Sequence, residues 1–470
     1  MLSRAQTYRP VVAVQMVYRA RFGAKRGRRL GTVGLAAYPG ATGAVQGGLM
    51  EQFSGVIFAT LPLFCLSLLI FVRRPLHATI WFLIYRSIVS VAAYLHIPGI
   101  GSIPFFVPAF LSLWAVIGLY HAFVSARLPR VLPVFSLIAV AATMIVSTVA
   151  FAAFNPGQAG GFITTTLKFI LPVGVYLGAY AGLRSDDDFR QLPRLLAAFL
   201  IVPVSVGIAQ SLAGWSYDYA VDAMVHGMRP VGTIIDPNAY GIFLCMGAFL
   251  VTPFAIPPGE KGMRALLAAI VLAIVLSRNR GSWICAVSAT AIGIALYRRY
   301  FNLAKVLSFA AVLALLAAPV VLARFADLGG VDRFGQSQDT FSERIAQSRH
   351  LLEAASQAPL TGYGAGSAEQ PWGTSTISRP PHDDYVRMIY EFGVPACLLY
   401  VLFLCDQVYF ATRIRAPENW TFGFSATCFM IYVMLISLVQ NLIYDSIMYS
   451  TIMLMMAITH RKKALGMATV

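Results

Sequence analysis

Apolar residues gather in long blocks along the chain, and short polar loops separate the blocks. An α-helix needs about 20 apolar residues to cross the hydrocarbon core of a bilayer, and most blocks approach that length. The pattern predicts spans near 54–72, 76–96, 104–124, 131–154, 163–183, 194–213, 238–256, 264–277, 282–297, 304–324, 385–410, 422–438 and 442–459. Because helices satisfy their own backbone hydrogen bonds in lipid, we expect an all-α, polytopic integral membrane protein of about 12–13 transmembrane helices.

The same pattern divides the chain into four parts. The predicted parts are a basic tail at 1–49, an N-terminal transmembrane bundle at 50–324, a long loop at 325–384, and C-terminal transmembrane helices with a cytoplasmic tail at 385–470. The first part is rich in arginine, glycine and alanine and contains no spanning segment. We therefore expect either a disordered tail there or a translation start at Met50.

Composition and charge placement agree with a membrane protein. Hydrophobic residues make up 58% of the chain and charged residues 12%, whereas a soluble domain carries about 25% charged residues. The net charge of +16 would suit a nucleic-acid partner, but the basic residues lie mostly in short loops on one side of the predicted spans, as the positive-inside rule describes. These loops are 73–74, 127–130, 184–194, 261–264, 297–300, 413–415 and 461–463. We expect that side to be the cytoplasm, the segment 325–384 to face the periplasm, and no nucleic acid to bind.

Three arginines lie on the opposite, outer side. Arg229 precedes the span at 238–256, and Arg278 and Arg280 lie in the tight turn 277–283. A guanidinium stays charged and can hold a phosphate through two parallel hydrogen bonds. The alternative is that these arginines extend to lipid headgroups. Three of them near helix ends on one side favour an anionic partner.

The long outer segment contains a predicted helix and a glycine-rich turn. Residues 342–357 have the pattern of an amphipathic helix, with Ile345, Leu351, Leu352 and Ala355 expected on one side. The turn at 359–366 carries three glycines, which can bring backbone N–H groups close to a ligand, although such patterns most often mark an ordinary loop.

A histidine and two acids follow directly before the next span. His382 can act as a general base near neutral pH, and Asp383 or Asp384 can orient it or raise its basicity. The alternative is an ordinary polar loop histidine or a helix cap.

The remaining polar features point to supporting roles. Arg86 and Lys168 lie inside apolar blocks and are expected to line a cavity or to pair with acids. The run 186–188 is three aspartates among arginines, which we interpret as a solvated turn. The six cysteines lie in apolar segments without a CxxC pair and are interpreted as small buried hydrophobic residues. No pair of outer carboxylates has metal-ligand spacing, so the predicted chemistry uses neither a metal nor another cofactor.

The order and spacing of these outer motifs resemble the O-antigen ligase and Wzy-type polysaccharide polymerase superfamily of bacterial membrane glycosyltransferases. The resemblance covers roughly 190–460 and rests on four pieces: 229–238, 277–283, 342–366 and 382–393. Relatives commonly carry His-Asn where this chain has His382-Asp383, and Arg278 is an addition to the usual single Ser-Arg-Gly turn, which Arg280-Gly281 fits best.

The resemblance implies a GT-C-type helical fold in the bacterial inner membrane. It also implies an undecaprenyl-pyrophosphate-linked saccharide donor and transfer, with inversion, to a sugar hydroxyl at the periplasmic face. His382 would be the catalytic base, and Arg229, Arg280 and Arg278 would bind the donor pyrophosphate. Supporting residues would be Asp383, Asp384, Tyr385, Asn238 and Arg344.

The acceptor remains open at this point. A polymerase adds the glycan to another lipid-linked repeat and works with a flippase and a chain-length regulator. A ligase adds it to lipid A-core. The histidine motif favours polymerisation of exopolysaccharide or O-antigen units. A transporter or flippase for a lipid-linked sugar is the third alternative, and it predicts internal repeats and charges near the bilayer midplane. The notable charges instead gather on one side.

Overall fold

The computed structural model describes the chain in a series of stretches, all within one compact unit, Ser54–Val470. The stretches are 74–92, 132–154, 165–166, 168–169, 172–214, 230–234, 236–257, 260–308, 311–312, 315, 318, 340–369 and 382–467. The predicted spans at 54–72 and 104–124, the tail at 1–49 and Arg229 lie outside these residues.

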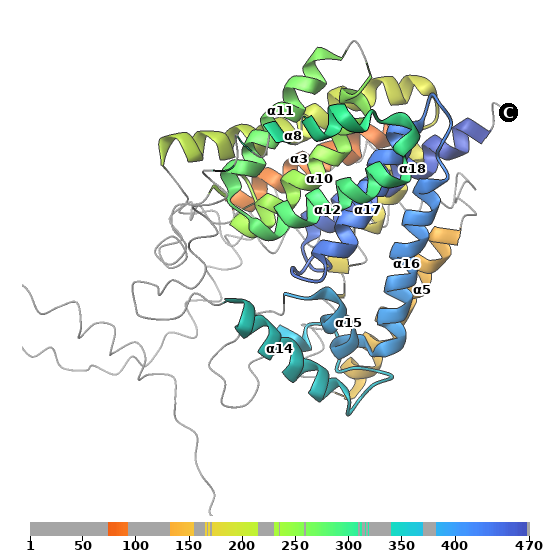
Figure 1. Cartoon of the computed structure of the whole chain (residues 1–470). Helices are drawn as coiled ribbons and strands as arrows, with labels where there is room; N and C mark the ends of the chain where they lie inside the picture. The colour runs from red at the N-terminus through yellow and green to blue at the C-terminus, as the bar shows by residue number, and fades with distance from the viewer. Residues whose placement is uncertain are drawn as a thin grey trace, which may run out of the picture. The chain divides into compact units, whose positions relative to one another are not determined.

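Every regular element in the described residues is a helix, which confirms the all-helical class (Figure 1). The α-helices are α3 (Pro75–Ala92), α5 (Leu132–Phe154), α7 (Val173–Gly182), α8 (Asp186–Ala213), α10 (Pro237–Ala255), α11 (Lys261–Ser277), α12 (Arg280–Leu296), α14 (Thr340–Ala355), α15 (Asp384–Phe392), α16 (Val394–Thr412), α17 (Trp420–Ile436) and α18 (Ser446–Met467). Two short 3-10 helices, η3 (Arg298–Tyr300) and η4 (Ser367–Glu369), lie in loops.

Four of these helices are long and apolar enough to cross a membrane by length and composition, namely those over Val134–Ala153, Asp186–Ala213, Pro237–Ala255 and Val394–Thr412. Their burial differs. The apolar window of α10 is 78% buried, whereas those of α5, α8 and α16 are 39–44% buried. The exposed remainder of these three helices carries large apolar side chains, such as Val146, Leu212 and Leu398. Such surfaces need lipid around them, which supports the predicted membrane protein.

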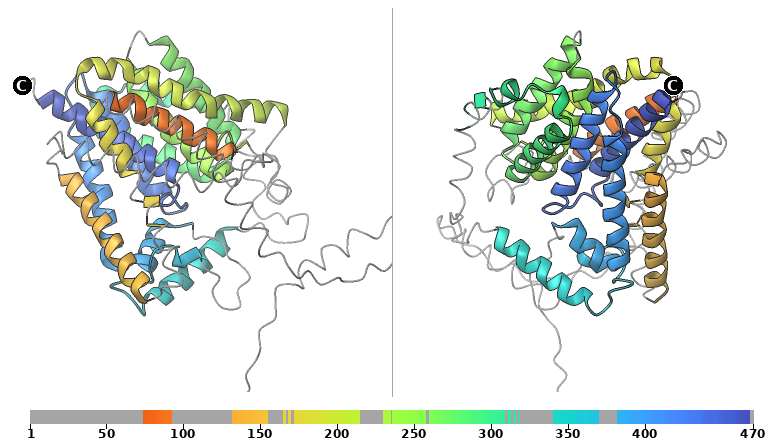
Figure 2. Two further views of the ribbon diagram at one scale, coloured as in Figure 1. Left: turned by 180° about the vertical axis from the view of Figure 1, so that it is seen from behind. Right: turned by 45° about the vertical axis from the view of Figure 1, so that its right-hand side comes forward.

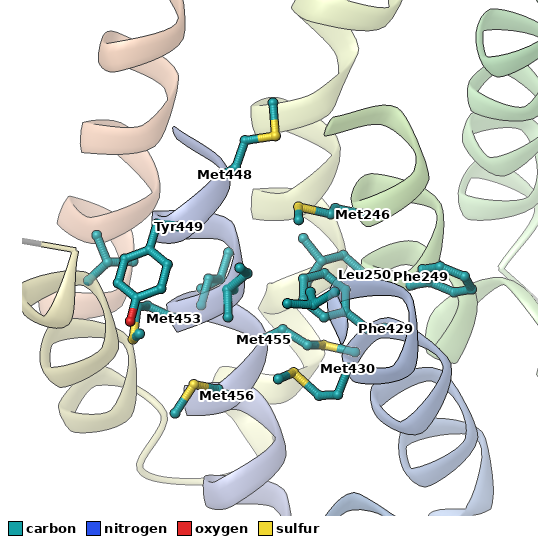
Figure 3. Close-up of a cluster of buried hydrophobic side chains, with 14 of the residues drawn as sticks. Met246, Phe249, Leu250, Phe429, Met430, Met448, Tyr449, Met453, Met455 and Met456 are labelled. Atoms are coloured by element: carbon teal, nitrogen blue, oxygen red, sulfur yellow. The ribbon is translucent and has the colours of Figure 1, made fainter. Parts of the chain in front are cut away.

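Helix α10 packs against α11, α12, α17 and α18. Its contact with α17 and α18 is rich in methionine, as Figure 3 shows for Met246, Met430, Met448, Met453, Met455 and Met456. The unbranched, polarizable methionine side chain fills irregular gaps between packed helices. Buried side chains of these three helices therefore form part of the core of the described structure.

The predicted single span at 385–410 is wrong, because the chain turns at Gly393 and forms two helices, α15 and α16. Gly393 has a φ of +85°, a backbone conformation that residues other than glycine rarely adopt. A Cβ there would lie 2.4 Å from the carbonyl oxygen of Leu360. Pro395 follows at the start of α16, where its missing N–H costs nothing. The helical period continues through this region, so periodicity alone does not reveal the break.

Helix α14 buries fewer of its apolar residues than the predicted amphipathic pattern requires. Leu351 and Ala355 are buried with Val386 and Tyr390 of α15, as expected. Ile345 and Leu352 were expected on the same side, but both are exposed. Figures 1 and 2 show α14 beside α15, near the ends of the paired helices α5 and α16.

Several of the predicted cytoplasmic loops gather at one end of the helices. The guanidinium of Arg299 donates to the carbonyl oxygen of Arg415 (2.9 Å), and Lys462 lies 3.8 Å from the carboxylate of Asp186. The three aspartates at 186–188 belong to the first turn of α8 and not to a loop, with Asp188 in a capping box with Ser185, while Asp186 and Asp187 are solvent-exposed as expected. Carboxylates are favourable at a helix N-terminus.

Candidate functional site

The turn that carries two of the outer arginines joins α11 to α12. Arg278 ends α11 in the left-handed conformation, with a φ of +54°, and its side chain is exposed. Asn279 caps α12 by accepting the N–H of Ser282 (3.2 Å). Arg280 is the first residue of α12 and is half-buried. The N-terminus of α12 carries a partial positive charge. Arg280 is its first residue, and Arg278 precedes it by two residues.

The same turn is bonded to the start of α10. The side-chain amide of Asn279 donates to the carbonyl oxygen of Asn238 (2.8 Å). Asp236 caps α10 by accepting the N–H groups of Asn238 and Ala239, both at 2.7 Å. The motifs 229–238 and 277–283 of the sequence therefore meet in the structure, through Asn238 and Asn279.

His382 stands directly before α15. Asp383 caps this helix by accepting the N–H groups of Tyr385 (2.9 Å) and Val386 (3.0 Å), so His382 is the residue before the cap. Both His382 and Asp383 are half-buried. Burial raises the pKa of Asp383, and the two N–H groups oppose that rise. The position leaves capping to Asp383 and not to His382.

Asp384 is turned toward another part of the chain, the segment 437–445 that connects α17 to α18. Its side chain is fully buried and accepts the N–H groups of Leu442 (3.0 and 3.1 Å) and Ile443 (3.4 Å). Its own N–H donates to the carbonyl oxygen of Ser437 (2.9 Å). Burial raises the pKa of Asp384 to about 7, against the opposing effect of these N–H groups. Asp384 therefore holds both ends of the segment 437–445.

Two further motifs reach the same segment. The guanidinium of Arg344, on α14, donates to the carbonyl oxygen of Val439 (3.1 Å). Gly281, next to Arg280, faces the side chain of Val439, whose Cγ2 would lie 3.8 Å from a Cβ at that glycine. The segment 437–445 thus lies beside α12 and is bonded to α14 and α15. Arg280 is on α12, Arg344 is on α14, and His382 directly precedes α15.

Helix α15 also carries a buried ion pair, between Arg387 and Glu391. The Nε of Arg387 donates to Oε1 of Glu391 (3.0 Å), and the two side chains are 1% and 0% exposed. The guanidinium of Arg387 lies over the ring of Tyr444, 4.0 Å from its centroid, and the Tyr444 hydroxyl donates to Oε2 of Glu391. The N–H of Ala368 donates to Oε1 of the same carboxylate (3.3 Å).

The glycine-rich turn at 359–366 packs against the end of α15. The N–H groups of Tyr363 and Gly364 donate to the carbonyl oxygens of Tyr390 (2.9 Å) and Glu391 (2.8 Å). A Cβ at Gly362 would lie 2.4 Å from the backbone of Glu391. These N–H groups therefore bond the last carbonyl groups of α15. This is a structural role for the turn, the alternative to binding a ligand.

Further polar residues make contacts at the start of α18 and at the end of α17. Asp445 caps α18, accepting the N–H groups of Ile447 and Met448, and the Nε of Arg86 donates to Ser446 (3.1 Å). Tyr385 donates its hydroxyl proton to the carbonyl oxygen of Met434 (2.9 Å). Within the described residues, no three His, Cys, Asp or Glu side chains lie close enough to hold a metal ion. Cys405 is exposed, unlike the buried cysteines expected in apolar segments.

The structure thus brings most of the predicted site residues to one region. Asn238, Arg278 and Arg280 lie around the α11–α12 turn, whereas Arg344, His382, Asp383, Asp384 and Tyr385 lie around α15 and the segment 437–445. The sequence reasoning missed Asn279, Asn441, Tyr444 and the Arg387–Glu391 pair. The pair carries a signal, since opposite charges four residues apart in an apolar stretch are partners on one helix face.

A comparison with protein-family models matches residues 265–401 to the family described as O-antigen ligase. The matched region runs from α11 into α16 and contains Arg278, Arg280, Arg344 and His382. No curated protein sequence matches the chain significantly. The match to the O-antigen ligase family model over residues 265–401 agrees with the resemblance that the sequence motifs indicated.

Proposed function

We propose that the protein is an inverting, metal-independent glycosyltransferase that moves a glycan from undecaprenyl pyrophosphate to a sugar hydroxyl at the periplasmic face of the bacterial inner membrane. The observation that carries the proposal is the convergence of α12, α14 and α15 on the segment 437–445, in a region that matches the O-antigen ligase family. Apolar helices beside the site suit a donor whose polyprenyl chain stays in lipid.

The arginines provide the charge that the leaving group needs. As the bond between the anomeric carbon and the pyrophosphate breaks, negative charge grows on the pyrophosphate oxygens. Arg280, the N-terminus of α12 and Arg344 supply fixed positive charge on this side of the helices, and Arg229 is expected to join them. Arg278 is exposed and is the weaker candidate. Fixed guanidinium groups stabilise such a leaving group without a metal.

His382 is proposed to be the base. The acceptor hydroxyl attacks the anomeric carbon from the face opposite the pyrophosphate, and its proton passes to a ring nitrogen of His382. One carbon–oxygen bond forms as the other breaks, so undecaprenyl pyrophosphate leaves and the anomeric configuration inverts. No enzyme nucleophile is needed. Asp383, and not His382, caps α15, so helix capping does not account for the histidine at this position.

The acceptor decides between two variants of the function. We favour polymerisation, in which the acceptor is the terminal sugar of another lipid-linked repeat unit. Ligation to lipid A-core is the second candidate, and the description of the matched family as O-antigen ligase favours it. Both variants share the donor, the arginines and the base.

A deletion strain separates these functions. Loss of a polymerase leaves single repeat units exported and attached to their usual carrier. Loss of a ligase leaves long polymer on undecaprenyl pyrophosphate and none on lipid A-core. Loss of a flippase stops repeat units from reaching the periplasm. Surface polysaccharide and lipid-linked intermediates are measured by gel electrophoresis and mass spectrometry, with the wild-type chain restored from a plasmid as the control. The third pattern would contradict the proposed transferase.

A further inference from the structure

The segment 437–445 has more polar ties to the rest of the site than its sequence suggests. It interrupts the helical run between α17 and α18. Residues within it accept from Arg344, donate to Asp384 and pack against Gly281. These three partners come from three different helices, of which α12 carries Arg280, α14 carries Arg344, and α15 directly follows His382.

The tie to α15 is a closed set of hydrogen bonds. Asp384 donates its N–H to Ser437 at one end of the segment and accepts from Leu442 and Ile443 near the other. With its amide nitrogen facing the carboxylate, Asn441 donates to Oδ1 of Asp384 (3.0 Å) and accepts from Arg387. A carboxylate with several N–H donors is a strong local clamp.

The second tie uses the buried ion pair. Tyr444, from the segment, donates to Glu391 and lies under the guanidinium of Arg387. Glu391 also accepts from Ala368, next to the glycine-rich turn. Removing one member of a buried pair leaves a charge without compensation, which usually harms the whole fold. Asp384 is therefore the better residue for a test, since its partners on the segment are neutral: backbone groups and the side-chain amide of Asn441.

We propose that Asp384, assisted by Arg387 and Glu391, is a positioning residue for glycan transfer: it clamps α15 to the segment 437–445 and thereby holds His382 in register with Arg280 and Arg344. The inference rests on the proposed function for its catalytic consequence. It assigns Asp384 to the neighbouring segment and not to orienting His382. A geometric error of about 1 Å at a reacting group can lower a rate about 10²-fold.

The clamp itself is tested by hydrogen–deuterium exchange, without any activity assay. The full chain is purified in detergent as wild type, Asp384→Ala and Asp384→Asn. The N–H groups of Leu442 and Ile443 lose their acceptor in the alanine variant, so peptides covering 437–445 should exchange at least about tenfold faster, since exchange reports local opening. Asparagine keeps one acceptor oxygen and should give an intermediate rate. Gln407→Ala is the matched control, because Gln407 is also a buried polar residue but bonds His460; it should leave these peptides unchanged.

The catalytic consequence is tested by transfer kinetics on the same preparations. For Asp384→Ala, kcat should fall about 10–100-fold, while the KM for the lipid-linked donor changes by less than about threefold, because the arginines still bind the pyrophosphate. Asp384→Asn should recover part of kcat. A general loss of folded protein would instead lower the active fraction and leave the kinetic constants of the remainder unchanged.

Three results would overturn the inference. Unchanged exchange in Asp384→Ala would remove the clamp. Faster exchange with wild-type kcat would remove its link to transfer. Should the alanine variant fail to insert, Tyr444→Phe, which deletes only the hydroxyl bonded to Glu391, must still speed exchange of 437–445 and lower kcat; no effect would contradict the proposal. If the Asp384 variants show the expected exchange pattern but the wild type transfers no glycan, the proposed function is contradicted and the structural clamp is still supported.

Discussion

At the residue scale, three consecutive polar side chains at the start of α15 have three different surroundings. His382 precedes the cap and is half-buried, Asp383 caps the helix, and Asp384 is fully buried against the segment 437–445. A helix that starts between them explains the difference, because successive residues at a helix start point about 100° apart. Asp383 and Asp384 therefore have structural roles, and His382 is the residue of the three that we propose to act on a substrate.

His382→Ala is expected to keep insertion and donor binding while lowering transfer about 10²–10⁴-fold, the usual contribution of a general base. His382→Gln should fail as well, because an amide accepts no proton. Product formation and donor binding are measured separately on detergent-purified protein. Near-normal transfer by His382→Asn would reject the catalytic assignment and leave the arginines untouched.

The same assignment makes transfer depend on pH. Transfer by the wild type should fall toward acid, because a protonated imidazole cannot act as a base. Asp384, whose pKa is raised to about 7 by burial, also gains a proton as the pH falls. Asp384→Asn separates the two groups: its lower rate should still fall toward acid if His382 is the base. A flat profile in this variant would assign the pH dependence to Asp384.

Arg280→Ala is predicted to lower transfer strongly, by about 10²-fold or more, because a fixed charge that stabilises a transition state is lost. Arg280→Lys should recover only part, since an ammonium lacks the two-pronged contact. Arg278→Ala, on the exposed neighbour, is the matched control and should matter less. Both rates are compared at equal expression. Full activity of Arg280→Ala would contradict this role and would favour the alternative, that these arginines contact lipid headgroups.

At the element scale, the hydrophobic pattern predicted most described helices and missed the breaks. The start of α5 and the end of α12 lie within a residue of prediction, since a polar loop marks each. The turn at Gly393 depends on the contact with Leu360, which is distant in sequence, and no local pattern encodes it. Half of the predicted face of α14 is exposed for a similar reason, because α15 covers only Leu351 and Ala355.

Gly393→Ala tests that break. At the φ of +85° and ψ of 169° of Gly393, a residue other than glycine costs about 1–3 kcal/mol, and here the Cβ of alanine would also meet the Leu360 oxygen at 2.4 Å. Gly214→Ala is the comparison variant, since Gly214 also has a positive φ, +62° with a ψ of 28°, but no atom near its missing Cβ. We expect Gly393→Ala to lower the thermal unfolding temperature in detergent more than Gly214→Ala does. Equal effects would show that the close approach to Leu360 contributes nothing.

At the scale of the whole molecule, the charge pattern predicted which loops share an end. Arg299 meets the 413–415 loop, and Lys462 meets the start of α8. The other end holds the starts of α10, α12, α15 and α18 and the candidate site. No local pattern predicts that the segment 437–445 joins these parts, because its partners lie up to 158 residues away, at Gly281.

Reporter fusions test the orientation. A fusion at Gly366 should be periplasmic and one at Gly262 cytoplasmic, because the basic loops are expected to face the cytoplasm. An alkaline phosphatase and a fluorescent-protein reporter at each site, which are active in opposite compartments, give the measurement. The same compartment for both positions would contradict the span assignment and the periplasmic site.

The account is tested most directly by reconstituting transfer with purified protein and a defined undecaprenyl-pyrophosphate-linked oligosaccharide, and by determining the anomeric configuration of the product by NMR. The account predicts that the wild type releases undecaprenyl pyrophosphate and forms a product of inverted configuration in the presence of a metal chelator, and that His382→Ala forms almost none. A product of retained configuration, or undiminished transfer by His382→Ala, would contradict it.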